Sequence, residues 1–273
     1  MRMVSVQGVR IPALGLGTWS LNGDVARRMV GHALEVGYRH IDTAQMYGNE
    51  AEVGEAIERS AVARDDIWLT TKIWPDNFRA ADLRRAAEQS VRTLRTEPDL
   101  LLLHWPSPSV PLAETIGALN EVKRRGLARQ IGISNFTVAL IREAVGHSQE
   151  PLIVNQVEYH PFLSQEAVFA EVRAQGMALT AYSPLAKGKV VRDATLQRIG
   201  ERHGKAASQV ALRWLIQQDG VAAIPRSSRE EGVRGNFEIF DFELTEAEMA
   251  EIFTLTRAGD RQVSVAGVAP RWD

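Results

Sequence analysis

The sequence predicts an α/β protein built as a closed (β/α)8 barrel of the TIM type, with a short N-terminal hairpin and extra helices. Short, nearly continuous apolar segments alternate with segments whose apolar residues recur at helical spacing. Strands that are apolar on both faces are typical of parallel sheets covered by helices, and eight such units close a barrel. Polar residues also follow three successive strands, where barrel enzymes carry their active sites. An open, doubly wound sheet is the alternative.

The eight predicted barrel strands are short and follow a small hairpin. Residues 4–9 alternate around Gln7 and Gly8, a pattern typical of two antiparallel strands joined by a turn. The barrel strands are expected at residues 14–18, 39–42, 67–71, 100–103, 130–134, 153–157, 177–182 and 221–224.

Most of the intervals between these strands contain apolar residues at helical spacing, here called helical stripes, which predict amphipathic helices. The first stripe consists of Ala26, Met29, Val30, Ala33 and Leu34. Comparable stripes begin at Leu83, Leu112, Ile141 and Val210, and residues 193–204 predict a surface helix. Thr245 and Glu248 form a capping box, which predicts a last helix with Met249, Ile252 and Phe253 on its inner face.

Composition and charge exclude several classes of function. The chain of 273 residues, with a net charge of -2 and no cysteine, suits a single domain over residues 1–273 without disulfides or thiolate chemistry. The near-neutral charge argues against a nucleic-acid partner, and no apolar run of signal-peptide or membrane-spanning length occurs. The six histidines are scattered without ligand spacing, so no metal site is expected. We expect a cytoplasmic protein, taken as a monomer.

Four titratable residues are expected to meet at the mouth of the barrel. One strand ends at Asp42, with Tyr47 five residues further on, and the next two strands end at Lys72 and His104. A phenol with an ordinary pKa near ~10 donates a proton poorly at neutral pH unless a neighbouring cation favours its phenolate. Lys72 would be that cation, with Asp42 keeping it charged. We therefore expect Tyr47 to act as a general acid with a lowered pKa, beside a carbonyl oriented by His104. The electron source would have to be a cofactor.

Seven motifs, in order along the whole chain, resemble those of the aldo-keto reductase superfamily. They are GYRHIDTAQMYGNE (37–50), TTKIW (70–74), LLLHWP (101–106), IGISNF (131–136), NQVEYHP (155–161), AYSPLAKGK (181–189) and IPRSS (224–228). The resemblance implies hydride transfer from NADPH to an aldehyde or ketone. It also implies that Tyr47 protonates the oxygen, that Lys72 and Asp42 tune this tyrosine, and that His104 orients the substrate.

The resemblance also assigns residues to the nicotinamide half of the cofactor. Ser134, Asn135 and Gln156 match positions that bind the carboxamide, and Tyr182 matches the ring that stacks on the nicotinamide. Thr18, Ser183, Leu185 and Gly188 complete this set, with the loop 183–188 expected over the pyrophosphate. Lys187 and Lys189 are interpreted as solvated loop charges.

The segment after the eighth strand carries the expected phosphate site. Arg226, Ser227, Ser228 and Arg229 place two guanidinium groups and two hydroxyls there, and Asn236 is retained from the family pattern. This chemistry favours NADPH over NADH. The sequence departs from the family at Arg226, Gly232 and Gly235, where a lysine, an adenine-packing arginine and a longer polar residue are usual, so weaker cofactor binding and some use of NADH stay open.

Aromatic residues at the same rim predict the substrate pocket. Trp19, Trp74 and Trp105 follow strands one, three and four, and Met46 joins them. The short loop after His104 suggests a shallow, open pocket with broad specificity. The tail resembles that of bacterial 2,5-diketo-D-gluconate reductases of the B type, which implies methylglyoxal and 2,5-diketo-D-gluconate as candidate substrates.

Several points stay open at this stage. The tail either folds over the mouth and brings Trp272 to the substrate, or it is a frayed terminus. Glu158, Tyr159 and His160 are interpreted as structural. Two other functions compete with the reductase: a Schiff-base lyase that uses Lys72, and a non-catalytic NADPH-binding regulatory module.

Overall fold

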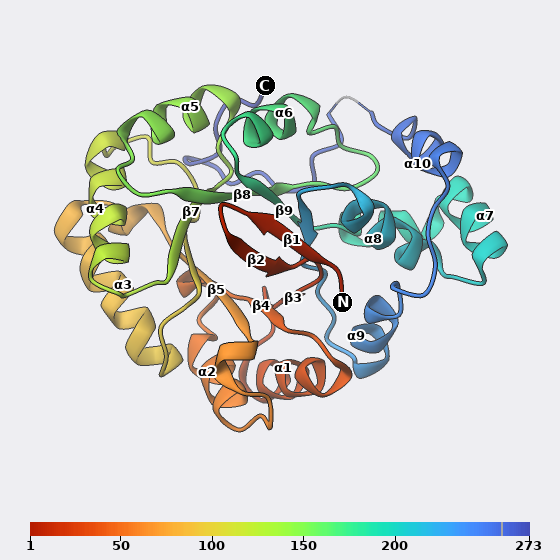
Figure 1. Cartoon of the computed structure of the whole chain (residues 1–273), viewed down its shortest axis with the longest axis horizontal. Coiled ribbons are helices and arrows are strands. Elements are labelled where there is room, and N and C mark those ends of the chain that lie inside the picture. The colour runs from red at the N-terminus through yellow and green to blue at the C-terminus, as the bar shows by residue number, and fades with distance from the viewer. Residues whose placement is uncertain (258) are drawn as a thin grey trace.

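The computed structural model describes residues 1–257 and 259–273, and its centre is a parallel sheet of eight strands in sequential order (Figure 1). The strands are β3 (Leu16–Gly17), β4 (His40–Asp42), β5 (Trp68–Ile73), β6 (Leu100–Leu103), β7 (Gln130–Ser134), β8 (Leu152–Glu158), β9 (Ala178–Tyr182) and β10 (Val221–Ala223). Nearly all strand residues are buried, as the apolar runs predicted.

The first and last strands meet and close the sheet into a barrel. Leu14 forms a parallel bridge with Ala223. The Gly15 amide donates to the Ala223 carbonyl at 2.9 Å, and the Ala223 amide donates to the Ala13 carbonyl at 2.8 Å. These bonds leave no open edge, so the barrel prediction is confirmed and the open doubly wound sheet is wrong.

Helices surround the barrel, and the predicted stripes face it. They are α1 (Gly23–Val36), α2 (Glu50–Glu58), α3 (Ala80–Leu94), α4 (Leu112–Arg124), α5 (Val138–His147), α6 (Glu166–Ala174), α7 (Ala194–His203), α8 (Ala207–Gln217), α9 (Glu230–Phe237) and α10 (Glu246–Phe253). Helices α2 and α6 have nine residues each and were not predicted, because so few turns give a weak periodic signal. Phe253 is 46% exposed, but its ring packs edge to face on Trp214 of α8 with centroids 5.0 Å apart, so it lies at the rim of the inner face.

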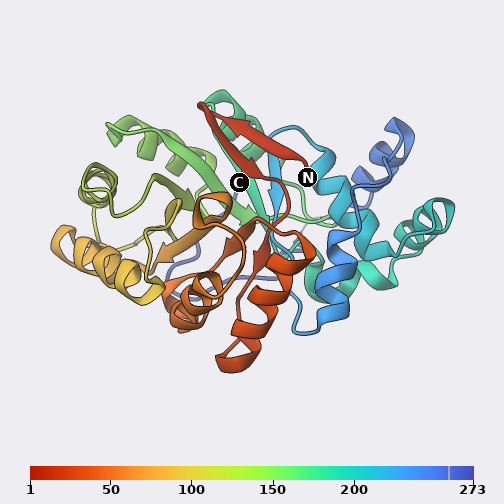
Figure 2. The same ribbon diagram turned by 60° about the horizontal axis from the view of Figure 1, so that its bottom comes forward.

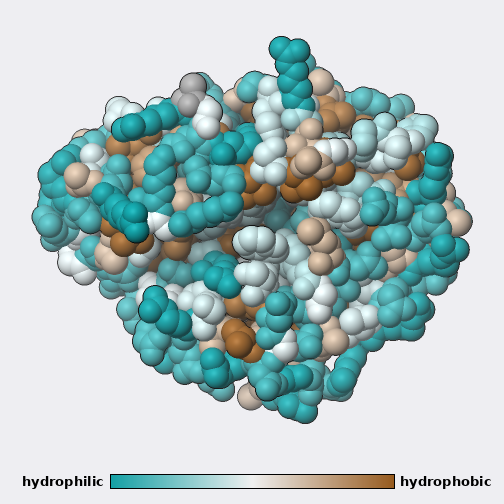
Figure 3. Space-filling model, turned by 180° about the vertical axis from the view of Figure 1, so that it is seen from behind, coloured by the Kyte–Doolittle hydropathy of each residue, from teal (hydrophilic) through white to brown (hydrophobic). Residues whose placement is uncertain are grey.

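The predicted hairpin covers the end of the barrel where the strands begin. It consists of β1 (Met3–Val6) and β2 (Val9–Pro12), and Figures 1 and 2 show it lying across that end. Gln7 and Gly8 both have positive φ, which a two-residue hairpin turn of this kind requires. The Gln7 amide donates to the carbonyls of Leu152 and Gly176, which start β8 and precede β9. The opposite end, where the strands finish, is left for a site, and Figure 3 shows it hollowed near its middle, with apolar side chains beside the hollow.

Among the described residues, no helix has both the length and the apolar character that crossing a membrane requires.

Candidate active site

Asp42 and Tyr47 are positioned by the turn that follows β4. Asp42 is the last residue of β4 and is buried. The chain then forms a single 3-10 turn (Gln45–Tyr47) that Gly48 ends with a φ of 65°, a conformation which glycine adopts without strain. Asn49 holds this turn against the preceding loop, since its side-chain amide donates to the carbonyls of Thr18 and Leu21.

Lys72 lies inside β5 rather than after it, which corrects the predicted end of that strand. Its side chain is fully buried within the barrel. The Lys72 ammonium donates to Asp42 at 2.5 Å, to the Thr43 carbonyl at 2.8 Å and to the Tyr47 hydroxyl at 3.4 Å. The other Asp42 oxygen accepts from the Gln156 amide at 2.8 Å. All three ammonium protons therefore have acceptors, and the expected contact between Lys72 and Tyr47 is present.

The pKa of Tyr47 moves in the opposite direction from the one expected. Burial, with the Asp42 charge as a smaller cause, raises it well above the ordinary value of 10.0. Burial also lowers the pKa of Lys72, against the opposing effect of Asp42. The expected lowering considered only the ammonium beside the phenol, whereas the loss of water around both groups has the larger effect on the pKa. Tyr47 is consequently held in its protonated form, as a hydrogen-bond donor.

His104 follows β6 and presents its ring beside Tyr47. The two rings lie edge to face with centroids 5.6 Å apart, and Trp74 lies edge to face on the other side at 5.3 Å. The His104 carbonyl accepts from the Asn135 side-chain amide at 2.9 Å, which fixes its backbone. Burial and then the Lys72 charge lower the pKa of His104 well below 6.5, so the imidazole is neutral at neutral pH. Its Nδ1 atom is buried without a protein partner.

These residues open onto a cavity of about 740 Å³ at the carboxyl ends of the strands. Asp42, Tyr47, His104 and Gln156 lie on its floor, but Lys72 does not line it. The volume is in the upper part of the range usual for small-molecule sites. A phenol donor and a neutral imidazole on the floor of such a cavity suit the polarisation and protonation of a carbonyl oxygen.

Comparison with known proteins identifies the family. Residues 13–256 match the model of the aldo/keto reductase family. The chain belongs to this family. It is 42% identical to the methylglyoxal reductase DkgB of Escherichia coli O157:H7 over 267 residues, which cover 96% of this chain and 99% of that protein. It is 38% identical to the glyoxal reductase of Bacillus subtilis (strain 168) over 92% of this chain and 91% of the relative.

Solved structures of aldo-keto reductases agree with this assignment. A protein described as a candidate 2,5-diketo-D-gluconic acid reductase B superimposes with a TM-score of 0.98 at 51% identity, covering 100% of this chain and 98% of that one. The aldose reductase from Schistosoma japonicum gives a TM-score of 0.90 at 32% identity, with 98% and 96% covered. The protein is thus an aldo-keto reductase, an oxidoreductase of a family that uses NAD(P)H.

The residues assigned to the nicotinamide lie together in this aldo-keto reductase. Asn135, Gln156 and Tyr182 line the cavity, and the Tyr182 hydroxyl donates to Asn135 at 2.7 Å. Ser134 lies behind the wall, with its hydroxyl donating to the Gln156 carbonyl at 2.8 Å. Thr18 lines the cavity with a buried hydroxyl that has no protein partner. A flat ring, a side-chain amide and an unpaired hydroxyl on one cavity fit a nicotinamide with its carboxamide.

The loop expected over the pyrophosphate also borders the cavity. Ser183, Leu185 and Gly188 line it, together with Lys187. Ser183, Ala186 and Lys187 have φ values between 46° and 52°, which is uncommon for residues other than glycine. The cavity wall there is a strained loop.

The predicted phosphate residues are spread more widely. Arg226 lines the cavity and donates to the Trp19 carbonyl and the Ser20 hydroxyl. Ser227 forms hydrogen bonds with the backbone of Arg229. A Cβ at Gly232 would lie 2.3 Å from the Ser227 hydroxyl, so the departure from the family at Gly232 makes room for this fold of Ser227. Ser228 and Arg229 are exposed, and Asn236 is buried in α9.

Four of the five predicted substrate residues line the cavity. Trp19 and Met46 are more than half exposed at its mouth, whereas Trp74 and Trp105 are more enclosed. Trp272 does not line it, and instead packs edge to face on Trp105 with centroids 6.3 Å apart.

The tail is folded against the barrel rather than frayed. The Val138 amide donates to the Asp273 side chain at 2.9 Å, and the Arg261 guanidinium lies 3.5 Å from the centre of the Trp272 ring. Of the two alternatives left open for the tail, the one in which it folds over the mouth is therefore correct, but residues 262–265 rather than Trp272 form part of the cavity wall. These tail residues make the cavity deeper than the shallow pocket expected from the short loop after His104.

Lys187 and Lys189 are not free loop charges, which corrects the earlier interpretation. Lys187 donates to the Gln262 carbonyl at 2.8 Å, and Lys189 forms an ion pair with Asp260. Glu158 and His160 are fully buried, and the His160 Nε2 atom lies 3.0 Å from a Glu158 carboxylate oxygen. Their hydrogen bonds are not directed at Tyr47, because Glu158 accepts from the Gln262 amide of the tail.

Within residues 1–257 and 259–273, no group of three or more potential ligand side chains is arranged to hold a metal ion.

Proposed function

We propose that this aldo-keto reductase reduces aldehydes and ketones to alcohols with NADPH, and that Tyr47 is the general acid. The observation that carries the proposal is the Tyr47 hydroxyl on the cavity floor, bonded to an ammonium that Asp42 and Thr43 hold in place. The cofactor, when bound, supplies the hydride. The chain supplies a donor for the oxygen on which negative charge develops.

The raised pKa of Tyr47 is compatible with this role. An alkoxide is a much stronger base than a phenolate, so even a buried phenol donates its proton as the alkoxide forms. Lys72 stabilises the phenolate that remains, because its ammonium lies 3.4 Å from the oxygen. Neutral His104 adds a second donor beside Tyr47, which orients the carbonyl and favours its reduced form.

NADPH is proposed over NADH because of the charge at the far end of the cavity. Arg226 borders the cavity, and Arg229 is exposed at the N-terminus of α9. Guanidinium groups at a helix start suit the additional phosphate of NADPH. The folded-back Ser227 removes one expected hydroxyl from that set, so we expect the preference for NADPH to be moderate.

Small dicarbonyls such as methylglyoxal, and keto-sugar acids such as 2,5-diketo-D-gluconate, are the proposed substrates. The relatives named for methylglyoxal and glyoxal, and the structure described for diketogluconic acid, support this choice. Apolar Trp19, Met46 and Trp74 around a polar floor suit a short carbon chain that carries carbonyl groups. We further propose that the whole chain works as one reductase domain, as a monomer in the cytoplasm.

The test is NADPH oxidation at 340 nm with methylglyoxal, 2,5-diketo-D-gluconate and simple aldehydes, beside NADH and beside Tyr47→Phe. The variant is expected to lose turnover by about 10²–10⁴-fold, the usual contribution of a general acid, while binding NADPH as the wild type does. Retained turnover would remove Tyr47 from this role. NADPH binding without reduction of any carbonyl would point to a regulatory module. A lyase is disfavoured, because Lys72 does not line the cavity and its ammonium already has three acceptors.

A further inference from the structure

The segment of residues 260–265, here called the tail wall, joins the two halves of the cavity. Its residues Gln262, Val263, Ser264 and Val265 line the same cavity as Leu185, Lys187 and Gly188 of the loop after β9. The proposed function places that loop over the cofactor. The tail wall therefore lies where the substrate side and the cofactor side of the cavity meet.

One attachment of the tail wall is a buried carboxylate at the end of β8. Glu158 has no exposed surface and accepts the Gln262 amide at 2.6 Å and the Val263 amide at 2.9 Å, one on each carboxylate oxygen. His160 lies 3.0 Å from one of these oxygens. Hydrogen bonds to a buried charge are among the stronger ones, so this attachment is firm. It belongs to a barrel strand and is fixed in position.

The other attachment is the loop itself. Lys187 donates to the Gln262 backbone carbonyl, and Lys189 forms an ion pair with Asp260. The Asp260 carboxylate also accepts a hydrogen bond from the side-chain amide of Gln262. The Lys189 ammonium lies 4.9 Å from the centre of the Phe162 ring, which holds it toward the tail. Because Ser183, Ala186 and Lys187 have positive φ, this loop is strained and its conformation depends on its contacts.

We propose that Glu158, Lys187 and Lys189 are positioning residues that make the tail wall respond to the cofactor. Glu158 anchors the tail wall to the barrel, and the two lysines transmit to it the conformation of the loop 183–188. Binding of the cofactor under that loop then orders the wall against which the carbonyl substrate packs. This inference rests on the proposed function for the place of the cofactor, but its test does not depend on turnover.

The first measurement is hydrogen exchange of the tail amides with and without NADPH. In the wild type, NADPH is expected to slow exchange across the tail wall. In Lys189→Glu the ion pair becomes a repulsion, and the slowing is expected to disappear while the Kd for NADPH stays within about twofold, since Lys189 is placed against Asp260 rather than the cofactor. The charge swap of Lys189→Glu with Asp260→Lys is expected to restore it. Equal slowing in the wild type and in Lys189→Glu, or none in the wild type, would overturn the proposal.

Kinetics give the second measurement. Lys189→Glu is expected to raise the KM for carbonyl substrates about two- to fivefold with kcat nearly unchanged, as suits a partly exposed ion pair. Glu158→Gln removes the buried charge and is expected to raise KM about tenfold and to speed exchange of the Gln262 and Val263 amides. Lys205→Met is the matched control, because Lys205 pairs with Asp241 and does not line the cavity.

The outcomes separate this inference from the proposed function. If no carbonyl is reduced, the proposed function fails, and the exchange data alone decide the inference. If Lys189→Glu weakens NADPH binding instead of changing the tail wall, the lysine belongs to the cofactor site and the coupling is refuted. Should Glu158→Gln fail to fold, the Lys189 and Asp260 variants still decide the result.

Discussion

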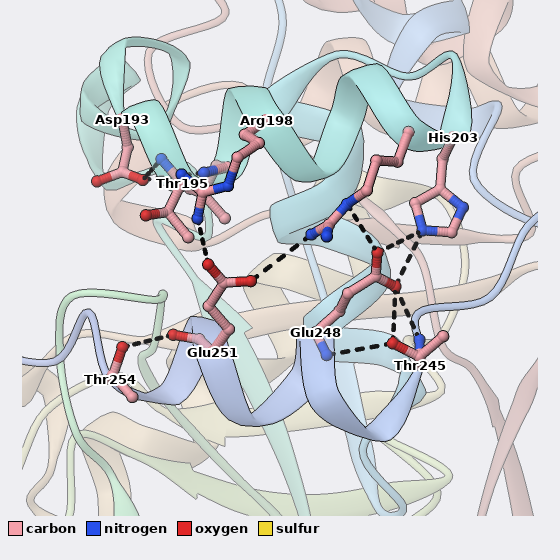
Figure 4. A network of polar contacts seen from close by, with 10 residues as sticks. Asp193, Thr195, Arg198, His203, Thr245, Glu248, Glu251 and Thr254 are labelled. Carbon is pink, nitrogen blue, oxygen red and sulfur yellow. Dashed lines mark hydrogen bonds and ion pairs between the residues drawn. The ribbon is translucent and has the colours of Figure 1, made fainter.

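Two charged clusters in this molecule use the same chemical groups in opposite surroundings. Asp42, Lys72 and His104 lie inside the barrel mouth and have lost nearly all contact with water. Between α7 and α10, by contrast, Arg198, Arg202 and His203 pair with Glu248 and Glu251 (Figure 4). The two arginines are about half exposed there, although Glu248 itself is only 6% exposed. Both clusters contain carboxylates, cations and an imidazole, so the difference between them comes from solvent.

The comparison explains where charge is costly. Burying Asp42 and Lys72 costs free energy that their attraction repays only because every proton and oxygen has a partner. In the α7–α10 cluster the cations keep much of their hydration, since the side chains of Arg198 and Arg202 are 53% and 50% exposed. Tyr47 and His104, whose pKa values are moved well away from the ordinary ones, accordingly lie in the barrel mouth, whereas the α7–α10 cluster joins two helices.

The largest expected effect is the loss of stability and turnover when Lys72 of the buried cluster is replaced. Lys72→Met leaves Asp42 as an unpaired buried charge and is expected to cost about 3–5 kcal/mol of the free energy of unfolding, with loss of turnover. Adding Asp42→Asn removes that charge and is expected to recover most of the stability but none of the turnover. Urea unfolding and NADPH oxidation on both variants make the measurement. Recovery of activity in the double variant would contradict a role for Lys72 beside Tyr47.

The two clusters should also respond to different ranges of pH. His104 has its pKa lowered by burial and by Lys72, so below the ordinary value of about 6.5 the unfolded chain binds a proton that the folded chain does not. Stability is expected to fall as pH drops below about 6.5, and His104→Gln should flatten that slope.

Glu248 provides the matched case between α7 and α10, where its own side chain is largely enclosed. Burial raises its pKa, but hydrogen bonds from Thr245 and His203 outweigh this and lower it below the ordinary 4.5. Its contribution is therefore present above about 4.5 and lost as pH falls through the lowered value. Glu248→Gln should change the slope only in that acid range. Unfolding midpoints in urea from pH 7.5 down to about pH 2.5 would reveal either pattern, and identical slopes in both variants would refute the contrast.

A smaller effect is expected at the start of α10. The Thr245 hydroxyl accepts from the Glu248 amide at 3.2 Å, and the Glu248 carboxylate accepts from the Thr245 amide at 2.9 Å (Figure 4). Thr245→Ala removes this cap and is expected to cost about 1 kcal/mol without altering turnover. Thr254→Ala, at the other end of the same helix, is the control with a smaller expected cost. A fall in kcat for Thr245→Ala would show that α10 is coupled to the cavity.

The smallest effect is expected for the exposed ion pair between Arg198 and Glu251. Arg198→Ala should cost less than about 1 kcal/mol, and added salt should reduce the difference further. Thermal unfolding at low and high salt tests this. A cost that is larger than for Thr245→Ala would mean that the α7–α10 cluster acts as a cooperative network.

Much of the fold could be predicted because its signals are local. The apolar runs and helical stripes are properties of neighbouring residues, and barrel strands deliver Asp42, Tyr47 and His104 to one rim by topology. The end of β5 was misjudged because Lys72 resembles the polar residues that close strands, although it points into the barrel. Its burial depends on Asp42 of the neighbouring strand, which a one-strand pattern does not include.

The sequence by itself determined the barrel, the family motifs and the identity of the four residues on which the proposed chemistry depends, because period and order along the chain are enough for these. Only the tertiary structure decided three features. These are the upward shift of the Tyr47 pKa, the packing of Trp272 on Trp105 outside the cavity lining, and the attachment of the tail wall to Glu158. The Gln262 amide and Glu158 are 104 positions apart, and no local pattern pairs them. Such contacts and the loss of water around them exist only once the chain is packed, since desolvation and long-range hydrogen bonds are properties of the whole fold.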